Sequence, residues 1–235
     1  MEATEIRKLA SLEDRHWWYR ERRFLLEREL RRLEAKGRRP GRALDIGAAG
    51  GGNTRVLGRR GWSPIALEYS AEGAHVAAAR GLSVIRADAR FLPLPATSID
   101  LVVAFDILEH IDEDHLAAEE ISRVLRPGGT ALVAVPCDMR LWSAHDVAVG
   151  HVRRYTRETL VTVVEKAGLV VDDLRSWNVL LRPVVARRRH RSAGSDLGQL
   201  PWIVNAGLHA TVALERYLPL GSRPGVSLLL RAHRP

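Results

Sequence analysis

Three histidines and one acid are the side chains best suited to chemistry in this chain: His110, His145, Asp146 and His151. The last three share a short loop with an arginine and a tyrosine. Histidine exchanges protons near neutral pH, and a neighbouring carboxylate can hold it in the required orientation. We therefore expect His145 or His151 to act as a base, or the loop to form a closed polar network. No metal site is expected, because two histidines six positions apart with one acid make a weak ligand pattern.

The elements that would position these side chains begin with a glycine-rich turn. The apolar run Ala43–Ile46 predicts a buried parallel strand, and it leads into Gly47–Gly52, which has four glycines in six positions. A helix-like segment, Asn53–Arg60, follows, and a second short strand ends on Glu68. Glycine lets a backbone approach a ligand closely, and an acid at this place can accept hydrogen bonds from ribose hydroxyls. The segment is typical of a nucleotide-binding βαβ unit.

The motif spacing distinguishes between ligands. The dinucleotide pattern G-x-G-x-x-G fails because position 49 is alanine, and the phosphate-binding loop fails because Asn53 and Thr54 replace its lysine and hydroxyl residue. The spacing Asp45-x-Gly47-x-Ala49-x-Gly51 instead resembles the first motif of the class I S-adenosylmethionine-dependent methyltransferases. Ala49 stands in for the middle glycine of that motif.

Later segments follow the same family pattern in order over roughly residues 40 to 180: Ala87-Asp88-Ala89, Ser98–Asp106, Leu108–Ile111 and Val124–Val135. The resemblance implies an α/β fold with a Rossmann-like seven-stranded sheet and helices on both faces. That sheet is mostly parallel, and strand seven, near residues 226–232, runs antiparallel beside strand six. Residues 125–129 are expected to end a helix, and strand five is expected over 130–135.

The resemblance also implies S-adenosyl-L-methionine as the cofactor and assigns residues to it. Glu68 would bind the ribose hydroxyls and Asp88 the adenine amino group. The residues between 45 and 105 that the resemblance assigns to cofactor binding are Asp45, Gly47, Ala49, Gly51, Glu68, Tyr69, Asp88, Ala89 and Phe105. Among the histidines, the loop pair is favoured as the base, since a histidine at the place of His110 often packs structurally in the family.

The segments outside this core carry two further expectations. Residues 1–40 are expected to form an N-terminal helical lid, in which Tyr19 and Arg23 cover the cofactor and the arginine meets its carboxylate; packing alone is the alternative for these aromatic residues. Residues 41–235 would form the methyltransferase domain, with a helical insertion at about 181–224. The basic and apolar stretch 187–217 in that insertion could be a substrate lid, a homodimer contact or a peripheral membrane contact.

The amino-acid composition limits the expected partners and the expected cellular compartment. The chain has 235 residues and a formal charge of +8, but nearly all of its basic residues are arginine and no aromatic–basic stretch typical of nucleic-acid binding is present, so nucleic acid is not an expected partner. The single cysteine, the charged N-terminus and the lack of an 18-residue apolar run predict a cytoplasmic protein without a signal peptide or membrane span.

The resulting expectation is a methyltransferase that acts on a hydroxyl, amine or carbon of a small molecule or natural product. Two alternatives stay open. The acceptor could be RNA or a lipid-linked or membrane-surface molecule, or the protein could bind the cofactor without transferring its methyl group. Nothing in the glycine motif would reveal a protein that binds the cofactor without transfer, and the sequence carries no motif that selects the acceptor.

Overall fold

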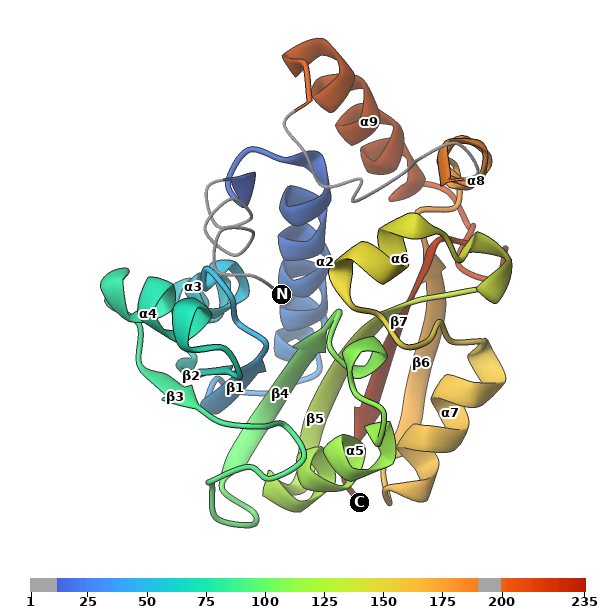
Figure 1. Ribbon diagram of the computed structural model, residues 1–235. Coiled ribbons are helices and arrows are strands. Elements are labelled where there is room, and N and C mark those ends of the chain that lie inside the picture. Colours follow the sequence, from blue (N-terminus) through green and yellow to red (C-terminus); the bar gives the residue numbers. More distant parts are fainter. Residues whose placement is uncertain (1–11, 190–199) are drawn as a thin grey trace.

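A computed structural model describes residues 12–189 and 200–235, which form a seven-stranded sheet with helices on both faces (Figure 1). The strand order is β3-β2-β1-β4-β5-β7-β6. All pairings are parallel except those of β7, which runs antiparallel to both β5 and β6. The strand bounds are β1 Arg42–Ile46, β2 Ser63–Glu68, β3 Val84–Arg86, β4 Ile99–Phe105, β5 Leu125–Pro136, β6 Val170–Trp177 and β7 Ser227–His233. The expected sheet and its antiparallel seventh strand are confirmed.

The central strands are apolar along their length because both of their faces are buried. In β1, Leu44 and Ile46 join one hydrophobic cluster while Ala43 joins the other. β4 divides in the same way, since Val102 packs into the first cluster and Val103 into the second. Alternate side chains point to opposite faces of a strand, so each strand contributes to two cores.

Helices α5 and α7 cover the first cluster, and α2 and α3 cover the second (Figure 1). The α-helices are α2 Trp17–Ala35, α3 Gly52–Arg59, α4 Ala71–Ala79, α5 Asp114–Val124, α6 Ala144–Val149, α7 Arg157–Lys166, α8 Arg182–Arg189 and α9 Trp202–Glu215. Short 3-10 helices span Leu108–His110 (η1) and Met139–Leu141 (η2). η1 and α6 carry the three candidate histidines or lie next to them.

Strand β5 differs from its prediction. It begins at Leu125, not at residue 130, because Leu125 already pairs with Ile99 and the register then shifts before Leu101 pairs with Thr130. Gly128 supplies a φ of +76° within this irregular stretch. The Pro-Gly-Gly sequence therefore forms a bulge within a strand, where the sequence predicted only the end of a helix.

Helix α2 is part of the core as well as a cover for the cavity described below. Leu25, Leu26 and Leu30 are buried in the second cluster. Glu29, 1% exposed, pairs with Arg175 of β6 and Arg231 of β7 at 3.0 Å each. The boundary between an N-terminal lid and the methyltransferase domain at residue 40 stays a prediction. These ion pairs nevertheless connect α2 to strands β6 and β7.

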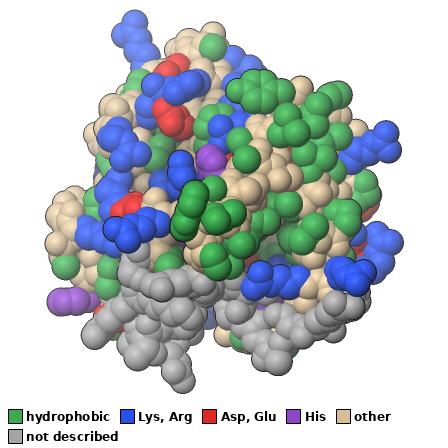
Figure 2. Space-filling view, turned by 90° about the horizontal axis from the view of Figure 1, so that it is seen from above, with side chains coloured by type: hydrophobic (Ala, Val, Ile, Leu, Met, Phe, Trp, Pro, Cys, Tyr) green, Lys and Arg blue, Asp and Glu red, His purple; other side chains and the backbone are tan. Residues whose placement is uncertain are grey.

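Helix α9 stands at the top of the molecule and has mostly exposed side chains (Figure 1). Its exposed apolar residues include Trp202, Ile203 and Leu214, and Tyr217 follows it. Seen from above, hydrophobic side chains gather on this end of the molecule with arginine or lysine around them (Figure 2). Of the 187–217 segment, residues 190–199 lie outside the described residues. None of the helices described is both long and apolar enough to cross a membrane.

Candidate active site

A cavity of about 700 Å³ opens at the carboxyl ends of the parallel strands. It lies where the strand order reverses between β1 and β4, which is where open α/β sheets bind ligands. Residues that directly follow β1, β2 and β4 line it, and so do residues of α2, α6, α8 and α9. One cavity therefore joins the glycine turn to the loop that carries the histidines.

The turn after β1 has the conformation that its glycines permit. Gly47 has a φ of +72°, and a Cβ atom added there would lie 1.8 Å from Cδ1 of Ile107. Ala49 also has a positive φ, of 45°, and its amide donates a 3.0 Å hydrogen bond to Oε2 of Glu68. Glu68 accepts a second hydrogen bond from the amide of Ser70 at 3.1 Å. Its carboxylate thus connects the two turns on either side of the cavity.

Most of the residues expected to bind the cofactor line this cavity. They are Gly47, Ala49, Glu68, Tyr69, Asp88, Ala89 and Phe105, with Tyr19 and Arg23 from α2. Asp88 is held by Arg90, whose hydrogen bonds lower the pKa of that carboxyl. These residues come from the carboxyl ends of four neighbouring strands, β3, β2, β1 and β4, and from α2. The fold therefore brings together residues that are spread over 87 positions of the sequence, from 19 to 105.

Asp45 and Gly51 do not line the cavity, and they shape its wall instead. Gly51 caps α3 with a φ of +79°. Asp45 is 1% exposed and accepts a 2.6 Å hydrogen bond from the hydroxyl of Thr54. Burial raises the pKa of Asp45 to about 7, although the Thr54 hydrogen bond opposes the shift.

We expect Asp45→Asn to flatten the pH dependence of stability. The folded-state pKa is raised, so between about pH 4 and 7 the unfolded chain releases a proton that the folded chain keeps. Stability should fall as the pH rises through this window, by up to about 1.4 kcal/mol per pH unit, and the asparagine variant should not show that loss. Urea unfolding of both proteins from pH 5 to 8 measures the difference, and parallel curves would contradict the raised pKa.

Arg22 lines the cavity as well as Arg23, the arginine predicted from the sequence. The Arg22 guanidinium is stacked on Trp18 at 4.9 Å and on Trp177 at 4.7 Å, and it pairs with Asp106. It is 3% exposed, and its Nε and Nη1 atoms have no hydrogen-bond partner among the described residues. These donors could bind an anionic group of a ligand, because an unpaired buried donor is costly.

The three candidate histidines lie close together at the cavity, and the role of the loop pair as a base stays a prediction. The rings of His110 and His151 lie 4.8 Å apart, and those of His145 and His151 lie 6.2 Å apart. All three line the cavity. Nδ1 of His151 lies 2.8 Å from Oδ1 of Asp146.

Asp146 organises this end of the site. It is fully buried, pairs with Arg154 at 2.8 Å and caps α6 through Ser143. Burial raises the pKa of the Asp146 carboxyl, but the bonds from His151 and Arg154 outweigh it and the net pKa is lowered. Asp146 therefore stays charged and holds the His151 ring through this contact; that the pair serves a catalytic base stays a prediction.

Two further residues at the cavity, Glu109 and Asn178, were not predicted from the sequence. Glu109 and Asn178 are both 0% exposed, and neither side chain has a hydrogen-bond partner among the described residues. Asn178 has a φ of +61° and follows β6, at the edge where the parallel strands end. Burial, with the charge of Asp106, raises the pKa of Glu109 well above its usual range. A polar residue shortly after a buried strand is the signal that could have identified both.

Comparison with known proteins places this fold and site in one family. A family profile described as a methyltransferase domain matches residues 17–174, about two thirds of the chain. The chain belongs to this methyltransferase family. The match begins at Trp17, so α2 lies within the matched region.

Relatives of the methyltransferase chain carry the cofactor in their names. A probable S-adenosylmethionine-dependent methyltransferase of Mycolicibacterium smegmatis is 29% identical over 72% of this chain and 66% of its own length. A protein of the same description from Mycobacterium tuberculosis is 26% identical over 71% of this chain and 61% of its own. The matched region thus spans less than two thirds of these relatives. Together with the family match, they assign S-adenosylmethionine as the cofactor.

Solved structures share the fold of the methyltransferase chain. A SAM-dependent methyltransferase from Archaeoglobus fulgidus superposes with a TM-score of 0.61, at 17% identity over 90% of this chain and 94% of its own. The (4+2)-cyclase SpnF superposes with a TM-score of 0.58, at 23% identity over 89% of this chain and 80% of its own. At such identities the likeness concerns the fold alone.

The residues of the methyltransferase site fit S-adenosylmethionine. Gly47 lines the cavity without a side chain, and a Cβ atom there would clash with Ile107, which also lines it. Glu68 offers a carboxylate to a ribose, and the unpaired donors of Arg22 suit a carboxylate group. The ribose hydroxyls and the carboxylate of the cofactor would therefore each find a residue of complementary chemistry at the cavity.

Proposed function

We propose that the protein transfers a methyl group from S-adenosylmethionine to a small molecule with an apolar body and one polar group. The observation that carries this proposal is the continuity of a single cavity from Glu68 to His151. A methyl donor held at the glycine turn would face an acceptor at the histidine end. The acceptor atom could be a hydroxyl oxygen, an amine nitrogen or a carbon.

The lining of the acceptor half supports this class of substrate. Leu181, Val184 and Val185 of the α8 segment and Leu200 and Leu208 of the α9 segment line the cavity above the strands. These apolar side chains suit the hydrocarbon part of an acceptor. The unpaired polar atoms of Asn178 and Ser227 lie in the same lining and could orient its polar groups.

The expected contribution of the protein is orientation, since S-adenosylmethionine supplies a methyl group already activated on a sulfonium. Glu68 and the glycine turn would hold the cofactor, and α2 and α9 would exclude water from above. Aligning the acceptor with the methyl group accounts for much of the rate enhancement. Asp146 holds His151 facing the acceptor half, where the histidine end assists loss of the acceptor's proton.

Tests for methyl acceptors should separate transfer from mere cofactor binding. The purified protein would be incubated with S-adenosylmethionine labelled in its methyl group and with pools of metabolites, lipids and RNA from the host. We expect label in the small-molecule pool. Label in no pool, together with normal binding of S-adenosylhomocysteine, would contradict transfer and favour a binding protein.

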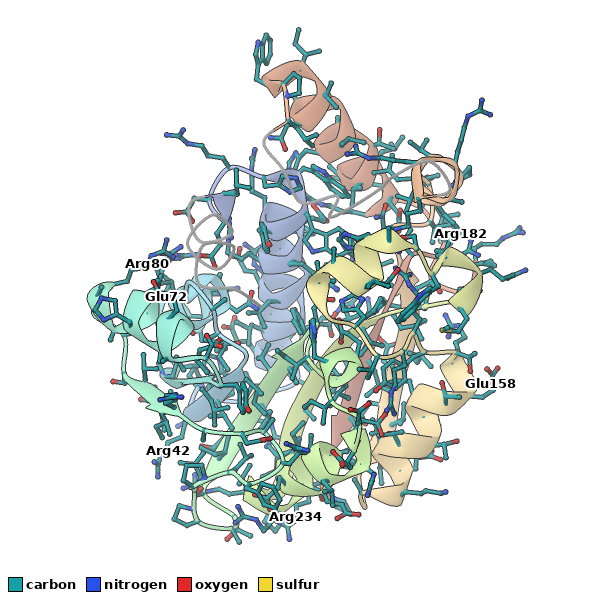
Figure 3. The ribbon with its side chains drawn as sticks, viewed as in Figure 1. Arg42, Glu72, Arg80, Glu158, Arg182 and Arg234 are labelled. Carbon is teal, nitrogen blue, oxygen red and sulfur yellow. The ribbon has the colours of Figure 1, made fainter. Side chains whose placement is uncertain are left out.

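Labelling of RNA would overturn the small-molecule proposal, and the placement of the arginines argues against that outcome. Figure 3 labels Arg42 and Arg234 at the lower end of the sheet, Arg80 beside α4 and Arg182 beneath α8. Three of these side chains are engaged within the protein: Arg80 pairs with Glu13 at 2.8 Å, Arg182 pairs with Asp138, and Arg234 donates to the carbonyl oxygens of Arg123 and Leu125. These four arginines lie at different sides of the molecule, and three of them pair within it, whereas an RNA-binding surface needs a continuous basic face.

A further inference from the structure

Glu109, His110 and His151 form a cluster that the loop pattern in the sequence did not reveal. One potential ligand atom of each residue lies within 4.8 Å of those of the other two. Glu109 and His110 belong to η1, after β4, whereas His151 comes from the loop after α6. All three residues line the cavity.

Glu109 is the most informative member. Its side chain is 0% exposed, and neither carboxylate oxygen has a hydrogen-bond partner among the described residues. The charges of Arg22 and Arg154 act on Glu109, but Arg22 pairs with Asp106 and Arg154 with Asp146, and neither donates a hydrogen bond to the Glu109 carboxylate. A buried carboxylate without donors is costly, so this position needs a proton or a cation.

The two histidines are oriented as metal ligands usually are. Nδ1 of His110 lies 3.1 Å from the carbonyl oxygen of Gly150, which can only accept, so this nitrogen must carry the hydrogen. Nδ1 of His151 faces the Asp146 carboxylate at 2.8 Å in the same way. Nε2 of each neutral ring then keeps its lone pair. Carboxylate or carbonyl partners on the second nitrogen are the usual support of metal-bound histidine.

Nε2 of His151 points toward the same acid, because it lies 3.8 Å from Oε1 of Glu109. Two ligands of one metal ion are typically about 3 Å apart, so a small side-chain rotation would bring this pair into range. Asp146 is itself fixed by Arg154 and Ser143, which holds His151 in place. The three potential ligand side chains would therefore need to move little to bind a metal ion.

We propose that Glu109, His110 and His151 bind one divalent transition-metal ion of the zinc type through one carboxylate and two imidazole nitrogens. Two histidines and one carboxylate suit Zn²⁺ or Fe²⁺ better than Mg²⁺ or Ca²⁺, which prefer oxygen ligands. The open side of the ion faces the cavity. There an oxygen of the acceptor would complete the coordination, a role that rests on the methyl transfer proposed above.

The test measures metal binding directly, without any acceptor. Protein without a polyhistidine tag would be stripped with a chelator and titrated with Co²⁺, followed by visible absorption, and with Zn²⁺ by calorimetry. We expect one equivalent of each metal to bind and the cobalt complex to absorb in the visible region. Cys137 should not compete, because it is buried and burial raises the pKa of its thiol to about 11.

Matched variants assign the binding to the cluster. Glu109→Gln and His110→Ala should each weaken metal binding at least about tenfold, whereas Glu113→Gln and His115→Ala, at exposed positions nearby, should not. A thermal shift with S-adenosylhomocysteine reports separately whether each variant is folded and binds the cofactor. Absence of stoichiometric binding to the wild type, or equal binding by the cluster variants, would overturn the metal site. Failure to methylate any acceptor would count against the proposed function alone.

Discussion

Replacing Glu68 with alanine should nearly abolish binding of S-adenosylhomocysteine. The Glu68 carboxylate connects the turn after β1 to the turn after β2, and it would accept both ribose hydroxyls. Hydrogen bonds to a charged group contribute about 1.5–3 kcal/mol each, so two lost bonds weaken binding by on the order of 100-fold or more. At 100 times its dissociation constant, the ligand should stabilise the wild type by about 2.7 kcal/mol, and the variant by less than about 1 kcal/mol.

Thermal denaturation with and without ligand measures this difference, and calorimetry gives the affinities. For a chain of this size, the wild-type shift corresponds to roughly 5–10 °C. Glu119→Ala, at an exposed position on α5, is the control and should keep the full shift. A full shift in Glu68→Ala, or a larger shift of the wild type with NAD, would contradict the assignment of this turn to S-adenosylmethionine.

His151→Ala should lower kcat by roughly 10²–10⁴-fold, the usual contribution of a group that assists proton transfer. Cofactor affinity should change little, because Glu68 ends β2 whereas His151 follows β5, and β1 and β4 lie between these two strands in the sheet. The expected loss is the same whether His151 takes the proton itself or acts through a bound cation. Steady-state kinetics on the true acceptor, with a separate titration of S-adenosylhomocysteine, would separate kcat from cofactor binding.

Two further variants are needed to interpret the turnover of His151→Ala. His75→Ala, at an exposed position on α4, should keep wild-type turnover. His145→Ala tests the other member of the loop pair, whose ring lies 6.2 Å from that of His151. Wild-type turnover in both His145→Ala and His151→Ala would mean that the loop only covers the site, and His110 would be the next residue to test.

The fold was largely predictable because the central strands can be recognised from short stretches of their own sequence. A short, wholly apolar run such as Leu101–Phe105 is typical of a strand that is covered by helices on both faces of its sheet. Glycines mark the ends of the helices that connect such strands. Strand β5 was placed too late for a physical reason. A Pro-Gly-Gly stretch is locally a turn, and only its pairing with β4 makes it part of a strand.

The candidate site was predictable where a residue acts through its position at the end of a strand. Glu68 and Asp88 occupy such positions, and the histidine loop begins at the end of β5. Glu109 and Arg22 were missed because their role depends on what surrounds them. A carboxylate without donors, or a guanidinium between Trp18 and Trp177, exists only after segments far apart in sequence have packed.

The position of β7 has a consequence for how the protein is made. This strand is synthesised after the other six, yet it lies between β5 and β6 and pairs with both. Until residues 227–233 leave the ribosome, β5 presents an unpaired apolar edge, and Glu29 of α2 lacks its partner Arg231. Cotranslational folding can therefore assemble the glycine turn early but cannot complete the core. The nascent chain should depend on chaperones longest in its β5–β6 half, and premature termination there should yield aggregation-prone fragments.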